Sequence, residues 1–167
     1  MAITMKELLD KLSSYNLFNY LLPGIVYVAI LEQVSSYSLI QKDIVIGVFL
    51  YYFIGLVISR VGSIIIEPVL KKLHILNFSD YSKYVSASKS DPLLPTLSEA
   101  NNMYRTLCSM FFCLALTILF EHIVPEFSWL ETWWSEILVV TLLALFILSY
   151  KKQTDYISKR VNNHKEN

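Results

Sequence analysis

An arginine inside an apolar segment is the residue whose chemistry most needs an explanation. Arg60 lies sixteen residues after Ile44, in an apolar run over residues 44–66. A charged side chain within a membrane span is costly, so it usually faces water, the protein interior or a partner. Arg60 therefore either extends its long side chain to the inner membrane surface or lines a water-filled path in an oligomer. Glu67, seven residues on and nearly on the same helix face, is a possible partner.

Small side chains flank Arg60 on the same run. Gly55, Ser59 and Ser63 recur at every fourth position and form one stripe on a helix. Such stripes let helices approach closely in lipid, either within one chain or between copies. A similar row in the next apolar run consists of Ser109, Cys113 and Thr117.

Two asparagines at the inner end of the first apolar run are alternative partners for Arg60. Asn16 and Asn19 mark the point where the chain enters the predicted bilayer. Side-chain amides hydrogen-bond across helices in membranes. The candidate pore or gate residues are therefore Asn16, Asn19, Ser59, Arg60 and Ser63.

A second group of candidates combines cations with aromatic side chains outside the apolar runs. Cations match phosphate groups, and aromatic rings can stack on bases. Interfacial Tyr and Lys anchors would give the same composition. The candidate nucleotide-binding residues are Lys71, Lys72, Lys83, Tyr104, Arg105, Lys151 and Lys152.

The common catalytic motifs are missing from the sequence. It contains no HExxH, GxSxG, P-loop, paired CxxC or glycine-rich dinucleotide loop. Glu121 and His122 are adjacent, so on a helix their side chains point about 100° apart and do not form a metal site by themselves. We therefore expect neither an enzyme nor a resident cofactor or metal.

The elements that must position these residues are four apolar runs. Of 167 residues, 54% are apolar and 17% are charged. The runs cover residues 17–31, 44–66, 107–124 and 137–150, and a bilayer core needs roughly 20 helical residues. The shorter runs reach that length if neighbouring Tyr and Trp side chains act as interfacial anchors. The sequence thus predicts an all-α integral membrane protein with four transmembrane helices.

The distribution of charge predicts how these helices are oriented. Of the fourteen Lys and Arg residues, Lys42 alone falls in a segment that must lie across the membrane from the rest. The loop over residues 125–136 carries three Glu and no Lys or Arg. Because positive loops stay inside, both termini and the middle segment are predicted to be cytoplasmic.

Five segments follow from this topology. They are an interfacial amphipathic helix (1–16), a first transmembrane hairpin (17–66), a cytoplasmic helical segment (67–105), a second transmembrane hairpin (106–150) and a basic cytoplasmic tail (151–167). Pro23 predicts a kink near the inner end of the first span. Residues 91–95 read as a turn. The third and fourth helices are predicted to extend inward and form a small cytoplasmic helical layer.

Three stretches resemble small bacterial multi-pass proteins of antiphage defence loci. They are SSYNLFNYLLPG at 13–24, ISRVGSIIIEP at 58–68 and LSEANNMYRTL at 97–107. In systems of this kind (CBASS, Pycsar and Hailong types) a nucleotidyltransferase makes a nucleotide signal, and a small membrane effector permeabilises the bacterial inner membrane. In the Hailong type, DNA oligomers hold the effector inactive. The resemblance covers most of the chain and implies no individual ligand residues.

The leading hypothesis is an oligomeric channel or pore effector of the bacterial cytoplasmic membrane, with a tetramer favoured. A nucleotide or oligonucleotide from a partner nucleotidyltransferase would gate it from the cytoplasmic face, and opening would depolarise the membrane and cause abortive infection. The alternative is a non-conducting membrane anchor that docks a cytoplasmic partner. A small transporter is disfavoured, because the sequence has neither an inverted repeat nor a midplane carboxylate.

Overall fold

The computed structural model describes residues 14–165, and every regular element in that range is a helix. The elements are α2 (Ser14–Asn16), η1 (Leu17–Leu21), α3 (Leu22–Val34), α4 (Ile44–Val61), η2 (Gly62–Ile66), α5 (Glu67–Lys72), α6 (Tyr81–Ser90), α7 (Leu93–Ile123), η3 (Val124–Glu126) and α8 (Ser128–Lys165). The predicted all-α class is confirmed. The interfacial helix predicted over residues 1–16 lies outside the described residues except for its last three, which form α2.

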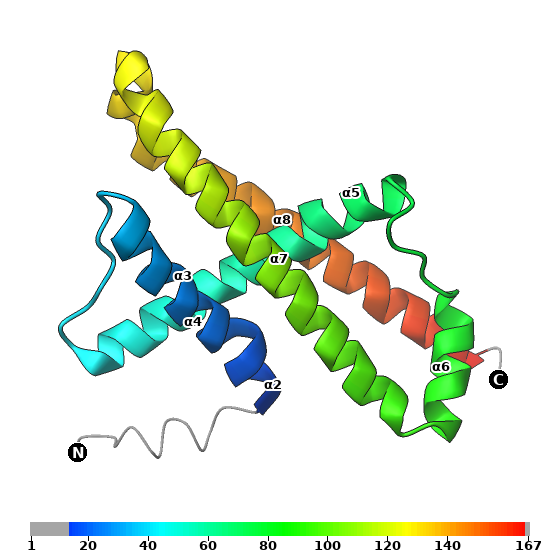
Figure 1. Ribbon diagram of the computed structural model, residues 1–167. Coiled ribbons are helices and arrows are strands. Elements are labelled where there is room, and N and C mark those ends of the chain that lie inside the picture. The colour runs from blue at the N-terminus through cyan, green and yellow to red at the C-terminus, as the bar shows by residue number, and fades with distance from the viewer. Residues whose placement is uncertain (1–13, 166–167) are drawn as a thin grey trace.

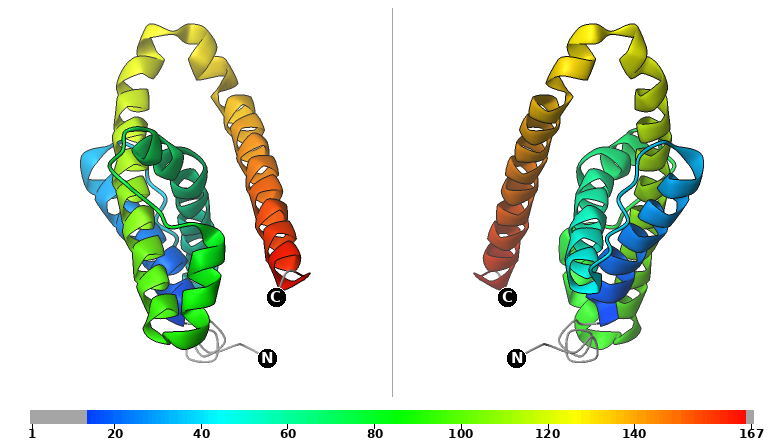
Figure 2. Two further views of the ribbon diagram at one scale, coloured as in Figure 1. Left: turned by 90° about the vertical axis from the view of Figure 1, so that its right-hand side faces the viewer. Right: turned by 90° about the vertical axis from the view of Figure 1, so that its left-hand side faces the viewer.

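Four helical stretches are long and apolar enough to cross a membrane. They are Leu17–Val34, Ile44–Lys72, Leu93–Glu126 and Ser128–Asn162. In Figure 1, α7 and α8 form a long hairpin, and α4 crosses behind α3 and then behind α7. Figure 2 shows α2 and the end of α8 at the same end of the molecule, opposite the turn between α7 and α8. Four helices that are suited to span a membrane are therefore present, as the sequence predicts.

The core lies between α3, α4 and α7. Its buried apolar members are Tyr27, Val28, Leu31, Ile58, Met110 and Leu114. Many large apolar side chains on the outer faces of the four long helices are exposed, as expected for surfaces that face lipid. The helix α8 stands apart from the other three over much of its length (Figure 2). The molecule is thus a three-helix bundle with a fourth, loosely attached helix.

Two π-helical segments, η1 and η2, interrupt the first and second spans, and each ends two residues before a proline. The prolines are Pro23 and Pro68. Proline has no N–H, so it cannot supply the next bond of a regular helix. The chain widens to i→i−5 bonding instead, as in the bond from the Leu22 N–H to the Leu17 carbonyl. The distortion predicted at Pro23 therefore takes the form of a π segment, and a second one precedes Pro68.

Two glycines bring α3 and α4 into backbone contact. A Cβ atom on Gly55 would overlap the Tyr20 carbonyl oxygen, and a Cβ atom on Gly24 would overlap the Tyr51 carbonyl oxygen. The two contacts are reciprocal. Gly24 lies four residues after Tyr20, whose carbonyl meets Gly55, and Gly55 lies four residues after Tyr51, whose carbonyl meets Gly24. The small-residue stripe thus packs within one chain at this point.

The middle segment, residues 67–105, differs from the sequence prediction where α7 begins. Its first helix, α5, ends at Lys72. The turn predicted over residues 91–95 is shorter, because α7 already begins at Leu93. The Asp91 carboxylate accepts the Leu93 N–H at 2.9 Å, and Pro95 fits the first turn, where its missing N–H has no helical acceptor to lose. The helices α7 and α8 both extend beyond the apolar runs 107–124 and 137–150, and α8 runs to the end of the described chain.

Candidate functional site

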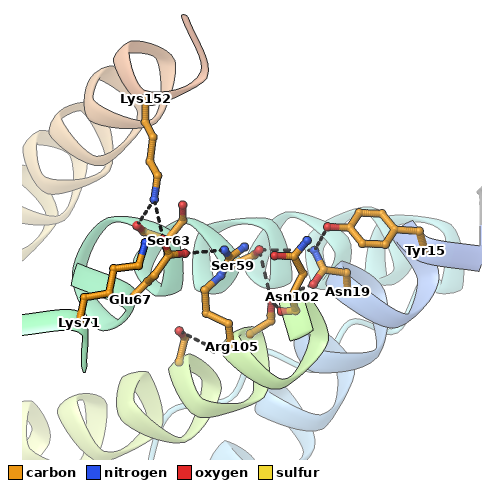
Figure 3. Close-up of polar contacts among 11 residues, drawn as sticks. Tyr15, Asn19, Ser59, Ser63, Glu67, Lys71, Asn102, Arg105 and Lys152 are labelled. Atoms are coloured by element: carbon orange, nitrogen blue, oxygen red, sulfur yellow. Dashed lines mark hydrogen bonds and ion pairs between the residues drawn. The ribbon is translucent and has the colours of Figure 1, made fainter. Parts of the chain in front are cut away.

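A single carboxylate receives cations from three directions where α5, α7 and α8 approach one another. One oxygen of Glu67 lies 2.8 Å from the Lys71 Nζ and 3.6 Å from the Lys152 Nζ, and the other lies 2.8 Å from the Arg105 Nη1. The Glu67 side chain is 9% exposed. Because Arg105 belongs to α7 and Lys152 to α8, these four residues, here called the Glu67 cluster, join three helices (Figure 3).

The backbone of η2 supplies the second acceptor for Lys152. The Glu67 N–H bonds to the Gly62 carbonyl in the π pattern, and Pro68 has no N–H to offer to the Ser63 carbonyl. The Lys152 ammonium donates to that carbonyl oxygen at 2.6 Å. The Ser63 carbonyl is thus left without a helical donor by the π segment and Pro68, and Lys152 of α8 donates to it instead.

The Glu67 cluster carries more positive than negative charge. Three cations face one carboxylate, which leaves two positive charges in excess. Within the described chain, the buried Nε atom of Arg105 has no hydrogen-bond partner. Arg105 therefore donates to Glu67 through Nη1, while its Nε–H has no acceptor among the described residues. A partly buried site with excess cations and a spare guanidinium donor is suited to bind an anion.

Arg60 does not pair with Glu67. Its Nη2 donates instead to the Tyr20 hydroxyl at 3.2 Å, and its buried Nε has no partner among the described residues. Of the possible partners named for Arg60 from the sequence, Glu67 is therefore not in contact with it. The reason is the π segment between the two residues, which adds to the residues per turn and rotates Glu67 away from the face of Arg60.

A second polar centre connects the first three spans. The Thr106 hydroxyl lies 2.9 Å from the Asn19 Oδ1 and 3.3 Å from the Ser59 Oγ, and the Asn19 amide donates to the Tyr15 hydroxyl at 3.3 Å. Asn19, Ser59 and Thr106 are all at most 1% exposed. Burial raises the pKa of the Tyr15 hydroxyl, so it stays protonated at neutral pH. These four residues, here called the Asn19 network, hold the helices together.

The candidate pore residues therefore lie in different surroundings from those predicted. Asn19 and Ser59 are buried in the Asn19 network, and Ser63 is 8% exposed beside the Glu67 cluster. Within one chain these three side chains line no open path, because they fill the contacts between helices. Asn16 and Arg60 are partly exposed.

The candidate ligand residues fall into two sets. Lys71, Arg105 and Lys152 meet in the Glu67 cluster. The other four are exposed and are absent from that cluster; Lys83 pairs with Asp80 at 3.6 Å on the surface of α6. The exposed four are Lys72, Lys83, Tyr104 and Lys151.

Two polar contacts between helices were not predicted from the sequence. Thr106 was not singled out, although it lies three residues before Ser109 and so begins the polar row of α7. The bond between the hydroxyls of Tyr27 and Thr117, at 2.7 Å, also ties α3 to α7. Extending the polar row by one helical turn would have identified Thr106, whereas nothing in the sequence pairs Tyr27 with Thr117.

Removal of the Thr106 hydroxyl tests the Asn19 network. We expect Thr106→Val to lower the free energy of unfolding in detergent micelles by about 1 kcal/mol, because it leaves buried amide and hydroxyl groups with fewer partners. Thr132→Val is the matched control, since the Thr132 hydroxyl also donates to the carbonyl four residues earlier but is exposed on α8. Equal stability of the two variants would show that the network contributes nothing measurable.

Comparison with known proteins gives no further guide to the site. No family model matches the chain, and neither the curated proteins nor the solved structures contain a significant match.

Proposed function

We propose that the chain is an oligomeric channel or pore effector of the bacterial cytoplasmic membrane, gated by a nucleotide or oligonucleotide at its cytoplasmic face. The observation that carries this proposal is the excess of two positive charges in the Glu67 cluster. Phosphate groups are the anions that such a cluster of Lys and Arg fits best. Opening would depolarise the membrane and abort an infection.

The arrangement of the helices supports a cytoplasmic position for this cluster. Arg105 and Lys152 lie on the parts of α7 and α8 that are farther from the turn between these two helices than from their other ends. The segments over residues 67–105 and 151–167 carry most of the Lys and Arg residues of the chain. Positive charge near the ends of spans favours the cytoplasmic side. A signal made in the cytoplasm would therefore reach the cluster without crossing the membrane.

Conduction requires more than one copy of the chain. The centre of the three-helix bundle is filled by the apolar core and the Asn19 network, so it offers no passage for ions. A ring of several copies, with four favoured, would enclose an axis between chains. Large parts of α8 and α7 are exposed and available for such contacts.

Leakage from liposomes is the direct test of gated conduction. We expect purified protein in liposomes to release a trapped ion, and cyclic or linear oligonucleotides to switch that release on or off. A partner nucleotidyltransferase would make the active compound. Tight liposomes under every condition, together with a uniform oligomer, would favour the alternative of a non-conducting anchor that docks a cytoplasmic partner.

Arg60 gives a sharper test of the pore. We expect Arg60→Ala to reduce the preference for anions in the ion flux while the oligomer mass stays unchanged, because a ring of positive side chains favours anions. Tyr20→Phe is the matched control, since it removes the hydroxyl that Arg60 contacts but keeps the charge. Unchanged flux and selectivity in Arg60→Ala would remove this residue from the conduction path.

A further inference from the structure

Glu67 occupies the place that a ligand anion would take. We infer that the Glu67 cluster is a phosphate-binding site whose resident anion is the Glu67 carboxylate, and that a bound phosphate withdraws Lys152 from Glu67 and Ser63 and so frees α8. The inference rests on the proposed nucleotide control and adds the means by which binding reaches a helix. It makes Glu67 an internal competitor of the ligand.

The exposure of the four side chains permits such an exchange. Lys71 is 42% exposed, Lys152 26% and Arg105 19%, whereas Glu67 is 9% exposed. The cations are therefore more accessible than the carboxylate that they surround. A phosphate monoester carries a charge of about −1.5 to −2, which is close to the excess charge of the cluster. The unpartnered Nε of Arg105 offers it a second donor from the same guanidinium.

Lys152 connects this site to the position of α8. The Lys152 side chain extends from α8 to the carbonyl of Ser63 and the carboxylate of Glu67 (Figure 3). The remaining contacts of α8 with α4 include stacking of Phe146 on Phe53, with ring centroids 6.1 Å apart. Beyond Lys152, the described side chains of α8 are exposed as far as Asn162. The exchange of one ammonium group therefore removes the innermost polar attachment of the helix.

A ligand shifts this equilibrium only if it binds the freed state more tightly than the docked state. That condition is met when the phosphate bonds to Lys152 after the ammonium has left Ser63. The phosphate can belong to a soluble nucleotide or to the headgroup of an anionic lipid, since both present the same group. The experiment must therefore separate these two sources.

Glu67→Gln separates competition from a purely structural role. In nanodiscs of phosphatidylcholine, we expect this variant to bind pyrophosphate and a tetrathymidylate about tenfold more tightly than the natural protein, because a like charge next to the phosphate is removed. Lys152→Gln should weaken binding about tenfold. Nanodiscs with phosphatidylglycerol identify a lipid source if they abolish binding of the soluble probes. Equal or weaker binding by Glu67→Gln would overturn the inference.

A distance measurement keeps the test decisive if Glu67→Gln fails to fold. Spin labels on Leu73→Cys and Ile157→Cys, both exposed positions, report the distance between the end of α5 and α8 after Cys108→Ser and Cys113→Ala. We expect pyrophosphate to lengthen it by about 5 Å or more, the rise of one helical turn. An unchanged distance with bound pyrophosphate would refute the release of α8. Because neither readout involves ion flux, both can succeed or fail independently of the proposed channel.

Discussion

The Gly55→Ala variant is expected to unfold at much lower denaturant than the natural protein. Its Cβ atom would overlap the backbone carbonyl of Tyr20, and a backbone atom inside a helix cannot move aside without separating η1 from α4. Overpacking of this kind costs about 1–3 kcal/mol. The gain in helix propensity from alanine offsets up to about 1 kcal/mol of this cost. Because the overlap is with backbone, the cost lies at the upper end of its range, and we expect a net loss of about 2 kcal/mol in the free energy of unfolding. The measurement is titration with sodium dodecyl sulfate in mixed micelles.

Gly47→Ala provides the matched control on the same helix. A Cβ atom on Gly47 would meet the ring edge of Tyr51 at 3.3 Å and the Gln41 side chain at 3.5 Å, and side chains of this kind can adjust. We expect it to change the free energy of unfolding by less than about 0.5 kcal/mol. Similar effects of Gly47→Ala and Gly55→Ala would mean that α3 and α4 are not in backbone contact.

Glu67→Gln is the second variant for which a large effect is expected. It preserves the shape of the side chain but leaves three neighbouring cations without their carboxylate. Breaking a buried ion pair costs about 3–5 kcal/mol. Because the three cations are partly exposed and screened by solvent, we expect a loss of about 2 kcal/mol. Pyrophosphate should recover part of the loss, since a ligand that binds the folded state stabilises it.

Asp80→Asn separates this effect from general loss of a negative charge. Asp80 pairs with Lys83 at 3.6 Å on the surface of α6, where both side chains are more than 70% exposed. Such pairs contribute little, so we expect a change below about 0.5 kcal/mol. If Glu67→Gln were as stable as Asp80→Asn, the Glu67 cluster would not hold the three helices together.

Much of the fold could be predicted from the sequence because the pattern is long and simple. The four apolar runs predicted four long apolar helices. The absence of Gly and Pro just before the third run and after the fourth predicted that α7 and α8 extend beyond these runs. The ends of α5 and α7 were less predictable. The start of α7 depends on the side chain of Asp91 reaching the Leu93 N–H, which is a detail of local geometry.

The candidate site was predicted in part. Lys71, Arg105 and Lys152 were selected by residue type, but Glu67 was considered only as a possible partner of Arg60, beside Asn16 and Asn19. A regular helix places Arg60 and Glu67 on nearly one face, and the π segment η2 changes that relation. Its signal is present in the sequence as Pro68, yet a proline alone does not reveal whether a helix kinks or widens. Contacts between helices that are far apart in the sequence, such as that of Tyr27 with Thr117, leave no pattern in the neighbouring residues from which they could be predicted.

Most of the length of α8 lies outside its apolar run. At about 1.5 Å per residue, its 38 residues extend about 57 Å, far more than the roughly 30 Å of a hydrocarbon core, whereas its apolar run over residues 137–150 accounts for only about 21 Å. An apolar run shorter than the core is accommodated by local thinning of the bilayer or by flanking side chains that extend to its surface. Lys152 follows this run by two residues, so a change in acyl-chain length would alter the surroundings of the ammonium group that attaches α8 to Ser63.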